Sequence, residues 1–295
     1  MSTYSKKLQN ILDLKKKFDS LKKGKEALLR ILEEVELAES VYNSNAIENS
    51  TLTLPDTEKI LLDLELSKDY SLREVFEAKN LARVYEYIQN KKDSIILNQD
   101  TILFIHGLLI GGIDDAIAGR FRKAGEYVRV GKHVAPAPEH IVRMIEVLLE
   151  EYKSNHIANV LEKIAYFHLQ FETIHPFCDG NGRIGRVLIN LQLQNFGYPN
   201  IIIRDKEKHL YYKTFTQFRD AKTTKQMERT IYLALSEGLH KRITYLEGQE
   251  IVTLAEYAKK HSRPLAGLIN AGRRQTLPAF REKGVWKIGT QGGMM

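Results

Sequence analysis

The residues with the clearest chemical potential lie in one short stretch, HPFCDGNGRIGR, which runs from His175 to Arg186. An apolar helical pattern ends near Thr173 and another begins near Gly182, so the stretch is a turn in front of a helix N-terminus. The first N–H groups of a helix have no intrahelical partner and carry partial positive charge. The glycines allow successive N–H groups to converge and an anion to approach closely, so we expect this turn to bind phosphate.

Charged side chains complete this expected phosphate site. Arg183 and Arg186 are three residues apart, share a helix face and can each donate bidentate hydrogen bonds to phosphate. Asp179 supplies a hard oxygen ligand suited to Mg²⁺ on a polyphosphate. His175 has an ordinary pKa suited to taking up a proton near neutral pH. Together these residues predict a nucleotide triphosphate site with a general base at its edge.

Two plainer interpretations of the stretch remain open. It could be a helix–loop–helix turn with solvated arginines, or it could belong to a metal site formed by His133, His168 and His175. Pro176 ends the helix that carries the last two histidines, which favours His168 as a core residue. The chain has no GxxxxGK[ST] sequence, so it is not a P-loop enzyme.

The stretch resembles the signature of Fic-domain proteins, HPF-x-[D/E]-GNGR-x-x-R, and matches every specified position. The likeness continues through residues 121–135 and GYPNIIIRDKEKHLYYKTF, and covers roughly residues 35–235. It implies a mostly α-helical fold and an enzyme that transfers AMP from ATP to a Ser, Thr or Tyr hydroxyl of a target protein. One family branch transfers phosphate and lacks the complete GNGR-x-x-R pattern, so AMP transfer is favoured.

The resemblance also implies roles for individual residues. His175 would deprotonate the target hydroxyl, Phe177 would anchor the loop with a buried ring, and Asp179 would hold the Mg²⁺ that accompanies ATP. Arg183 would reach the β-phosphate and Arg186 the γ-phosphate. The α- and β-phosphates would be bound by the backbone of Gly180, Asn181 and Gly182 and by the Asn181 side chain.

Two further segments would contact the nucleotide in a Fic protein. Tyr211 and Tyr212 match a pair that lines the adenine pocket in relatives, although Arg219 stands near the place of an asparagine often found there. A β-hairpin expected within residues 121–135 matches the family's flap, which covers the nucleotide and pairs with an extended target segment by strand addition. The matching flap residues are Val130, Gly131, Lys132 and His133.

A second motif, SNAIEN, precedes this region. Ser44 and Glu48 are four residues apart, so on a helix they share one face, and the plain interpretation is a helix C-terminus with a solvated glutamate. The motif resembles the inhibitory sequence [S/T]-x-x-x-E-[G/N] of the Fic branch whose inhibitory helix is N-terminal to the domain. The resemblance implies a Glu48–Arg186 ion pair and a largely self-inhibited enzyme. In some relatives the same glutamate activates water to remove AMP.

The elements that must position these motifs are expected to be mainly helical. Apolar residues recur at three- and four-residue steps from Leu8 to about Tyr42, with a break at residues 23–25 that predicts a helical hairpin. Ser44–Thr57 reads as a polar link. Further helices are expected at Thr57–Leu66, Ser71–Asn90, Asn98–Leu109, Glu139–Tyr152, Ile157–Thr173, Gly182–Phe196, Lys206–Arg219 and Lys225–Glu247.

A separate C-terminal unit is expected after these helices. A helix opening at Thr253, a second helix near Pro264–Ala271 and a strand–turn–strand in LPAFREKGVWKI resemble the winged helix-turn-helix units of excisionase-like DNA-binding proteins. A protein-docking or structural role is the alternative to DNA contact. The basic side chains available for phosphate are Arg263, Arg273, Arg274, Arg281, Lys283 and Lys287.

We therefore expect a mainly α protein, a Fic-type helical bundle with a small β-hairpin flap and a small winged-helix-like unit. The expected domains are an N-terminal helical region with the inhibitory helix at 1–95, a Fic catalytic core at 96–235 and the winged unit at 250–290. The competing function is a DNA-binding regulator whose Fic site only senses nucleotide. The motif opposes it, because a sensor would not need His175.

Composition sets outer limits on function. The chain has 295 residues, a net charge of +7 and a single cysteine, Cys178. The positive charge favours anionic partners, and one cysteine excludes an intrachain disulfide and a cysteine-based zinc site. The opening MSTYSKKLQN has no apolar signal region, and no apolar run reaches the length of a membrane span. We expect a cytoplasmic protein without a membrane partner, and a homodimer stays open.

Overall fold

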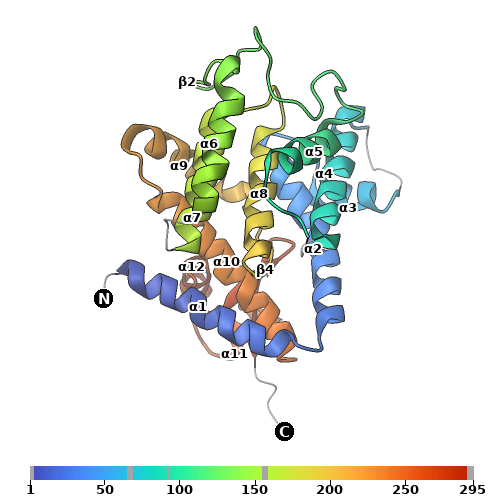
Figure 1. Ribbon diagram of the computed structural model, residues 1–295. Coiled ribbons are helices and arrows are strands. Elements are labelled where there is room, and N and C mark those ends of the chain that lie inside the picture. Colours follow the sequence, from blue (N-terminus) through green and yellow to red (C-terminus); the bar gives the residue numbers. More distant parts are fainter. Residues whose placement is uncertain (1–2, 65–68, 92–93, 155–158, 291–295) are drawn as a thin grey trace. The chain divides into compact units, whose positions relative to one another are not determined.

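The computed structural model describes residues 3–64, 69–91, 94–154 and 159–290, which are mostly helical (Figure 1). The chain forms two compact units. The larger unit comprises Leu37–Tyr198 and Ile202–Glu228, and the smaller unit comprises the described parts of Met1–Glu36, Pro199–Ile201 and Arg229–Met295. The division into domains at 1–95, 96–235 and 250–290 stays a prediction.

The larger unit contains the helices that surround the motif. Helix α2 (Glu26–Ile47) reaches into it from the smaller unit at residue 37. Its further elements are α3 (Leu54–Leu61), α4 (Leu72–Asn90), α5 (Gln99–Ile110), β1 (Arg129–Val130), β2 (His133–Val134), η1 (Pro138–His140), α6 (Ile141–Ser154), α7 (Val160–Ile174), α8 (Asn181–Asn195), η2 (Asp205–Glu207) and α9 (Lys208–Ala221).

Local sequence explains why several of these helices begin where they do. The Ser71 hydroxyl accepts a hydrogen bond from the backbone N–H of Glu74, and this caps α4. Asn98 caps α5 in the same way, through the N–H of Thr101 at 2.8 Å. Helix α7 ends at His175, whose φ of 49° turns the chain out of the helix. These caps fix the ends of the helices that carry the site.

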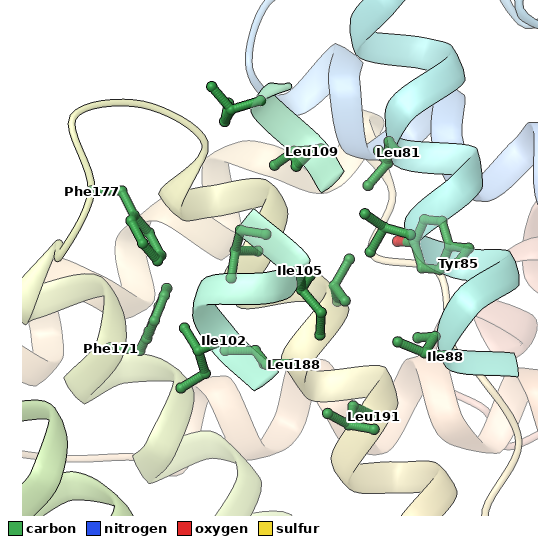
Figure 2. Close-up of a cluster of buried hydrophobic side chains, with 14 of the residues drawn as sticks. Leu81, Tyr85, Ile88, Ile102, Ile105, Leu109, Phe171, Phe177, Leu188 and Leu191 are labelled. Atoms are coloured by element: carbon green, nitrogen blue, oxygen red, sulfur yellow. The ribbon is translucent and has the colours of Figure 1, made fainter. Parts of the chain in front are cut away.

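The core of the larger unit lies between α4, α5, α7 and α8 (Figure 2). Burying a Leu or Ile side chain fully contributes roughly 1.5–3 kcal/mol, so this cluster holds the four helices together. Phe177 of the motif lies in the same cluster, which ties the loop to the core. The labelled members are Leu81, Tyr85, Ile88, Ile102, Ile105, Leu109, Phe171, Phe177, Leu188 and Leu191.

Most helix predictions are confirmed to within a few residues. The hairpin of α1 (Thr3–Lys22) and α2 is present, and so is the β1–β2 ribbon, with Gly131 at φ 59° in its turn. The polar link predicted from Ser44 was wrong in its first residues, because α2 continues to Ile47. The predicted ends Leu66 and Ile157 lie outside the described residues.

The smaller unit contains α1, most of α10 (Lys225–Leu246) and the C-terminal elements. These are β3 (Glu250–Thr253), α11 (Leu254–Lys260), α12 (Leu265–Arg273), β4 (Ala279–Glu282) and β5 (Val285–Thr290). The strands form an antiparallel sheet in the order β3-β5-β4. A capping box of Thr253 and Glu256 begins α11. The two predicted helices and the β4–β5 ribbon are present, and β3 was not predicted. The winged-helix-like interpretation stays a prediction.

The basic residues of this C-terminal region divide into two groups. Arg281 pairs with Glu237 at 2.6 Å, and Lys287 pairs with Glu282 at 2.6 Å. The side chains of Arg263, Arg273, Arg274 and Lys283 are exposed. Contact with DNA stays a prediction that rests on the second group. Among the described residues, no helix combines the length and the apolarity needed to cross a membrane.

Candidate active site

A cavity of about 410 Å³ opens in the larger unit at the motif. It is lined by residues 175 and 178–183 of the motif, by residues 48–50 directly after α2, and by residues 73, 74 and 77 of α4. Three segments that are distant in sequence thus converge on the predicted phosphate site.

The loop of the motif is closed by Asn181 and Phe177. The Asn181 side-chain amide donates to the Phe177 carbonyl at 2.8 Å and accepts from the Phe177 N–H at 2.9 Å. The Phe177 ring is fully buried and stacks on His106, with ring centroids 3.7 Å apart. Because both ends of the Asn181 amide are bonded to backbone, this side chain holds the loop, and phosphate binding at Asn181 would fall to its N–H.

Two residues that sequence reasoning missed support the loop from behind. Arg122 is buried, and its Nε donates to the carbonyl of His175 at 2.9 Å. His106 Nδ1 accepts the Gly119 N–H at 3.0 Å, so Nε2 carries the proton and donates to the Asp179 carbonyl at 3.2 Å. No local sequence pattern distinguishes these two residues from other arginines and histidines.

His175 lies at the edge of the cavity as a neutral imidazole. Burial lowers its pKa to about 4, and Arg122 acts in the same direction. Its Nδ1 is 3.9 Å from Oε2 of Glu172. Burial raises the pKa of Glu172 to about 8, with a further contribution from Glu48. At neutral pH His175 is therefore unprotonated and able to accept a proton.

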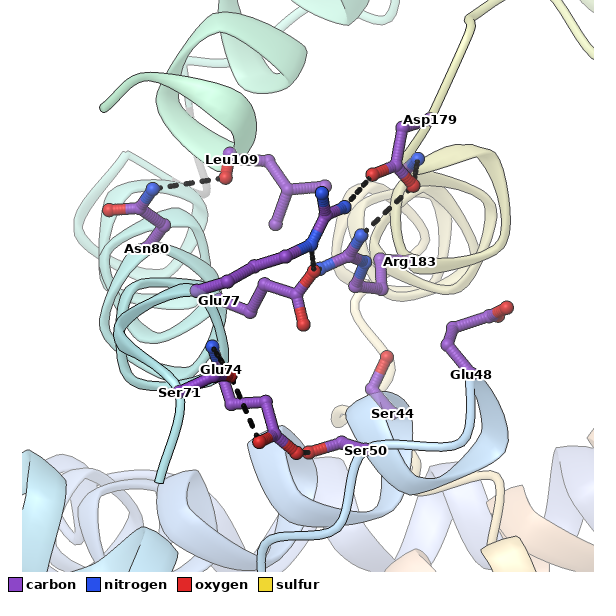
Figure 3. A network of polar contacts seen from close by, with 12 residues as sticks. Ser44, Glu48, Ser50, Ser71, Glu74, Glu77, Asn80, Leu109, Asp179 and Arg183 are labelled. Atoms are coloured by element: carbon purple, nitrogen blue, oxygen red, sulfur yellow. Dashed lines mark hydrogen bonds and ion pairs between the residues drawn. The ribbon is translucent and has the colours of Figure 1, made fainter. Parts of the chain in front are cut away.

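Asp179 and Arg183 take part in a polar network with α4 (Figure 3). Asp179 Oδ1 accepts from the Gly180 N–H at 2.6 Å and from Arg183 Nη2 at 3.2 Å. Arg183 Nη1 lies 3.1 Å from Oε1 of Glu77. Arg73 pairs with both Glu77 and Asp179. Sequence reasoning did not find Arg73 or Glu77.

Arg186 is buried and faces the end of α2. Its Nε donates to the Ser44 hydroxyl at 2.9 Å and its Nη2 to the Ser44 carbonyl at 2.8 Å. Nη2 also lies 2.9 Å from Oε1 of Glu48. Asn49 has a φ of 68°, which ends α2 and leaves the Glu48 side chain directed at the motif. The ion pair implied by the inhibitory motif is present.

The space that the Glu48 carboxylate occupies is suited to an anionic group. A Cβ added to Gly182 would stand 2.2 Å from Glu48 Oε1 and 3.2 Å from Arg186 Nη1. Gly182 lies in the first turn of α8, where the helix carries partial positive charge. Arg186 Nη1 is buried and has no hydrogen-bond partner among the described residues. These groups form a cradle for one anionic oxygen group, which in this structure is the Glu48 carboxylate.

The remaining predicted site residues do not line the cavity. Tyr211 is buried, and its hydroxyl lies 2.8 Å from His168 Nε2. The Tyr212 hydroxyl donates to the Ile47 carbonyl at 2.9 Å. In the flap, Val130 is exposed and His133 Nε2 is 2.8 Å from the Thr173 carbonyl. Their roles toward adenine and target stay predictions. In the described part of the chain, no three metal-ligating side chains gather, so the histidine metal site has no support.

Comparison with known proteins identifies the family that the motif belongs to. Residues 96–193 match the family model of the Fic/DOC family. The chain is 32% identical over 216 residues to a protein adenylyltransferase Fic of Nematostella vectensis, covering 71% of this chain and 49% of that protein. It is also 32% identical to a protein adenylyltransferase Fic of Aedes aegypti, covering 67% of this chain and 42% of that protein. The chain thus spans about half the length, or less, of these curated relatives.

Solved structures with the same fold point to the same family. A Fic domain containing signalling protein from Bacteroides thetaiotaomicron aligns with a TM-score of 0.73 and 26% identity, over 82% of this chain and 98% of that one. A fragment of Fic-1 from Caenorhabditis elegans aligns with a TM-score of 0.69 and 25% identity, over 83% of this chain and 73% of that fragment. With a complete motif in a helical unit of matching fold, this chain carries a Fic domain of the Fic/DOC family.

Proposed function

We propose that this chain is a protein adenylyltransferase that transfers AMP from ATP to a Ser, Thr or Tyr hydroxyl of a target protein. The curated relatives that it matches carry the name protein adenylyltransferase. The observation that carries the proposal is the cradle of Gly182 and Arg186, which holds a carboxylate at a helix N-terminus beside a neutral histidine. Such a cradle suits a phosphate group of ATP.

In the proposed reaction the target hydroxyl oxygen attacks the α-phosphorus. The bond from the α-phosphorus to the oxygen that bridges it to the β-phosphate breaks, and pyrophosphate leaves. The hydroxyl proton passes to His175, whose lowered pKa keeps the imidazole unprotonated near neutral pH. Arg183 would bind the β-phosphate and Arg186 the γ-phosphate, so binding energy is used to align the α-phosphorus for in-line attack.

The residues present fit a Mg²⁺ ion that accompanies ATP. Asp179 directs a carboxylate into the cavity, and its side chain is 36% exposed. Magnesium in nucleotide sites is commonly held by one or two carboxylates together with the phosphates of the substrate. Bound there, the ion would neutralise charge on the phosphates. In this proposal Asp179 is its protein ligand.

Self-inhibition by Glu48 is part of the proposal. While the carboxylate occupies the Gly182–Arg186 cradle, the γ-phosphate cannot, and a nucleotide that enters would hold its α-phosphate out of line. A second, hydrolytic role belongs to the same proposal, with Glu48 activating water to remove AMP from the target.

The alternative, a nucleotide-sensing DNA-binding regulator, is not favoured, because a sensor has no need of an unprotonated histidine at the phosphate site. DNA contact through the exposed arginines of the C-terminal region, a homodimer and a cytoplasmic location stay predictions. They do not affect the proposed chemistry.

The proposal is tested by labelling proteins of a cell lysate with ATP that carries ³²P at the α-phosphate. We expect Glu48→Gly to raise labelling by at least about tenfold over the parent, because a misaligned α-phosphate readily costs more than that. Glu34→Gly, which removes an exposed glutamate of α2, is the matched control and should label at the parent rate. Equal labelling by all three proteins would contradict self-inhibition.

A further inference from the structure

Helix α4 contributes three charged residues to the cavity, Arg73, Glu74 and Glu77, of which Arg73 and Glu77 lie one turn apart. Arg73 and Glu77 form a closed ring of alternating charge with two motif residues, Asp179 and Arg183. Glu77 Oε1 lies 3.1 Å from Arg73 Nε and 3.1 Å from Arg183 Nη1. Asp179 accepts from Arg183 through Oδ1 and from Arg73 through Oδ2. Figure 3 shows Arg183 lying beside both Glu77 and Asp179.

The four residues differ in how freely they can move. The Arg183 side chain is 4% exposed and lies in the first turn of α8. The Arg73 side chain is 57% exposed and forms ion pairs with Glu77 and Asp179. A cation that binds Oδ2 of Asp179 can therefore displace Arg73, whereas it cannot displace Arg183 without disturbing the helix.

Arg73 and a divalent ion are both positively charged, so they compete for the carboxylate of Asp179. Asp179 is paired with two cations, with Arg183 through Oδ1 and with Arg73 through Oδ2. Arg73 thus supplies part of the positive charge that a divalent ion would supply. Without Arg73, the carboxylates of Asp179 and Glu77 would share only Arg183, and their attraction for a divalent ion would increase.

We propose that Arg73 is a built-in counter-ion that competes with the divalent metal of the nucleotide for Asp179, and that Glu77 is the positioning residue that holds Arg73 there. The proposal rests on the proposed function, in which Asp179 is the metal ligand. It makes the metal dependence of nucleotide binding a property of α4 as well as of the motif. Arg73 is released from Asp179 when metal and nucleotide arrive together.

The test measures how strongly Mg²⁺ and ADP promote each other's binding. The dissociation constant of ADP is measured by calorimetry with saturating Mg²⁺ and again with EDTA. The EDTA value divided by the Mg²⁺ value is the ratio that measures the coupling between ADP and Mg²⁺. The full chain with Glu48→Gly is used, so that the carboxylate does not obstruct the cradle. ADP is used in place of ATP so that no AMP transfer adds to the measured heat of binding.

We expect Arg73→Ala to increase this ratio by about fivefold or more, a typical size for coupled sites. Glu77→Gln, which releases Arg73 from its position, should increase it by a smaller factor. Lys79→Ala is the matched control, because Lys79 lies on the same helix and pairs outside the site with Asp63. Its ratio should equal that of the Glu48→Gly parent.

An unchanged or smaller ratio in Arg73→Ala would overturn the counter-ion proposal, provided that Asp179→Ala still reduces the ratio to near one. A ratio that Asp179→Ala leaves unchanged would instead overturn the metal role of Asp179 in the proposed function. The two failures are thus distinguished by one set of titrations. Thermal melting of each variant establishes that it is folded.

Discussion

Glu48 Oε1 lies 2.9 Å from Arg186 Nη2 and 2.2 Å from the point where a Cβ of residue 182 would stand. One carboxylate thus occupies the space that a glycine leaves open and pairs with the arginine beneath it. The same space is suited to a phosphate group. Inhibition and nucleotide binding are therefore alternative uses of one cradle.

Gly182→Ala should weaken nucleotide binding without activating the enzyme. The new Cβ would displace the Glu48 carboxylate, but it would also fill the space that a phosphate needs. In the Glu48→Gly background we expect the affinity for ATP to fall by about tenfold or more, corresponding to roughly 1.4 kcal/mol. Gly267→Ala, in open space on α12, is the control. Unchanged ATP affinity in Gly182→Ala would contradict the claim that this cradle binds a phosphate of ATP.

The loss of activity at low pH should reflect the lowered pKa of His175. Burial and Arg122 lower this pKa to about 4, so the base stays unprotonated and active down to about pH 5. The profile of kcat/KM is the correct measurement, because it reports the free enzyme. Labelling by Glu48→Gly should persist well below pH 6.5. Half-maximal loss near pH 6.5 would mean that His175 behaves as an exposed histidine or is not the base.

Glu172 should make the fold less stable as the pH rises. Burial raises its pKa from the ordinary 4.5 to about 8, so its contribution to stability is full below pH 4.5 and is lost as the pH rises through 8. Glu172→Gln has no such titration. We expect the Tm of this variant, relative to the parent, to rise by about 3 °C or more between pH 5 and pH 8.

The same measurement in the Glu48→Gly background provides the control. Glu48 contributes to the raised pKa of Glu172, so its removal should reduce the pH-dependent difference. A Tm difference that stays constant across pH in both backgrounds would show that Glu172 does not titrate in this range.

The motif and its partner glutamate could be predicted from sequence because their information is local. HPFCDGNGR is contiguous, and the Ser44–Glu48 spacing is visible within one helical turn. The contact of Glu48 with Arg186 followed from the resemblance and is present in the structure. The helices were predictable from their period, whereas β3, with only four residues, was not.

The residues that support the site could not be predicted because their roles arise only in the folded chain. Arg73 meets Asp179 from a position 106 residues away in sequence. In the sequence, Arg73 and Glu77 resemble an ordinary exposed pair on one helix face. Arg122 looks like one of many basic residues, and only its burial against the His175 carbonyl distinguishes it.

The most direct test of the account compares Glu48→Gly with Glu48→Gly/His175→Ala, using ATP labelled at either the α- or the γ-phosphate. The account predicts that Glu48→Gly transfers the α-label and no γ-label to protein. It predicts that the double variant binds ATP but transfers the α-label at least about a hundredfold more slowly, since the base has been removed. Transfer of the γ-label, or equal transfer of the α-label without His175, would contradict it.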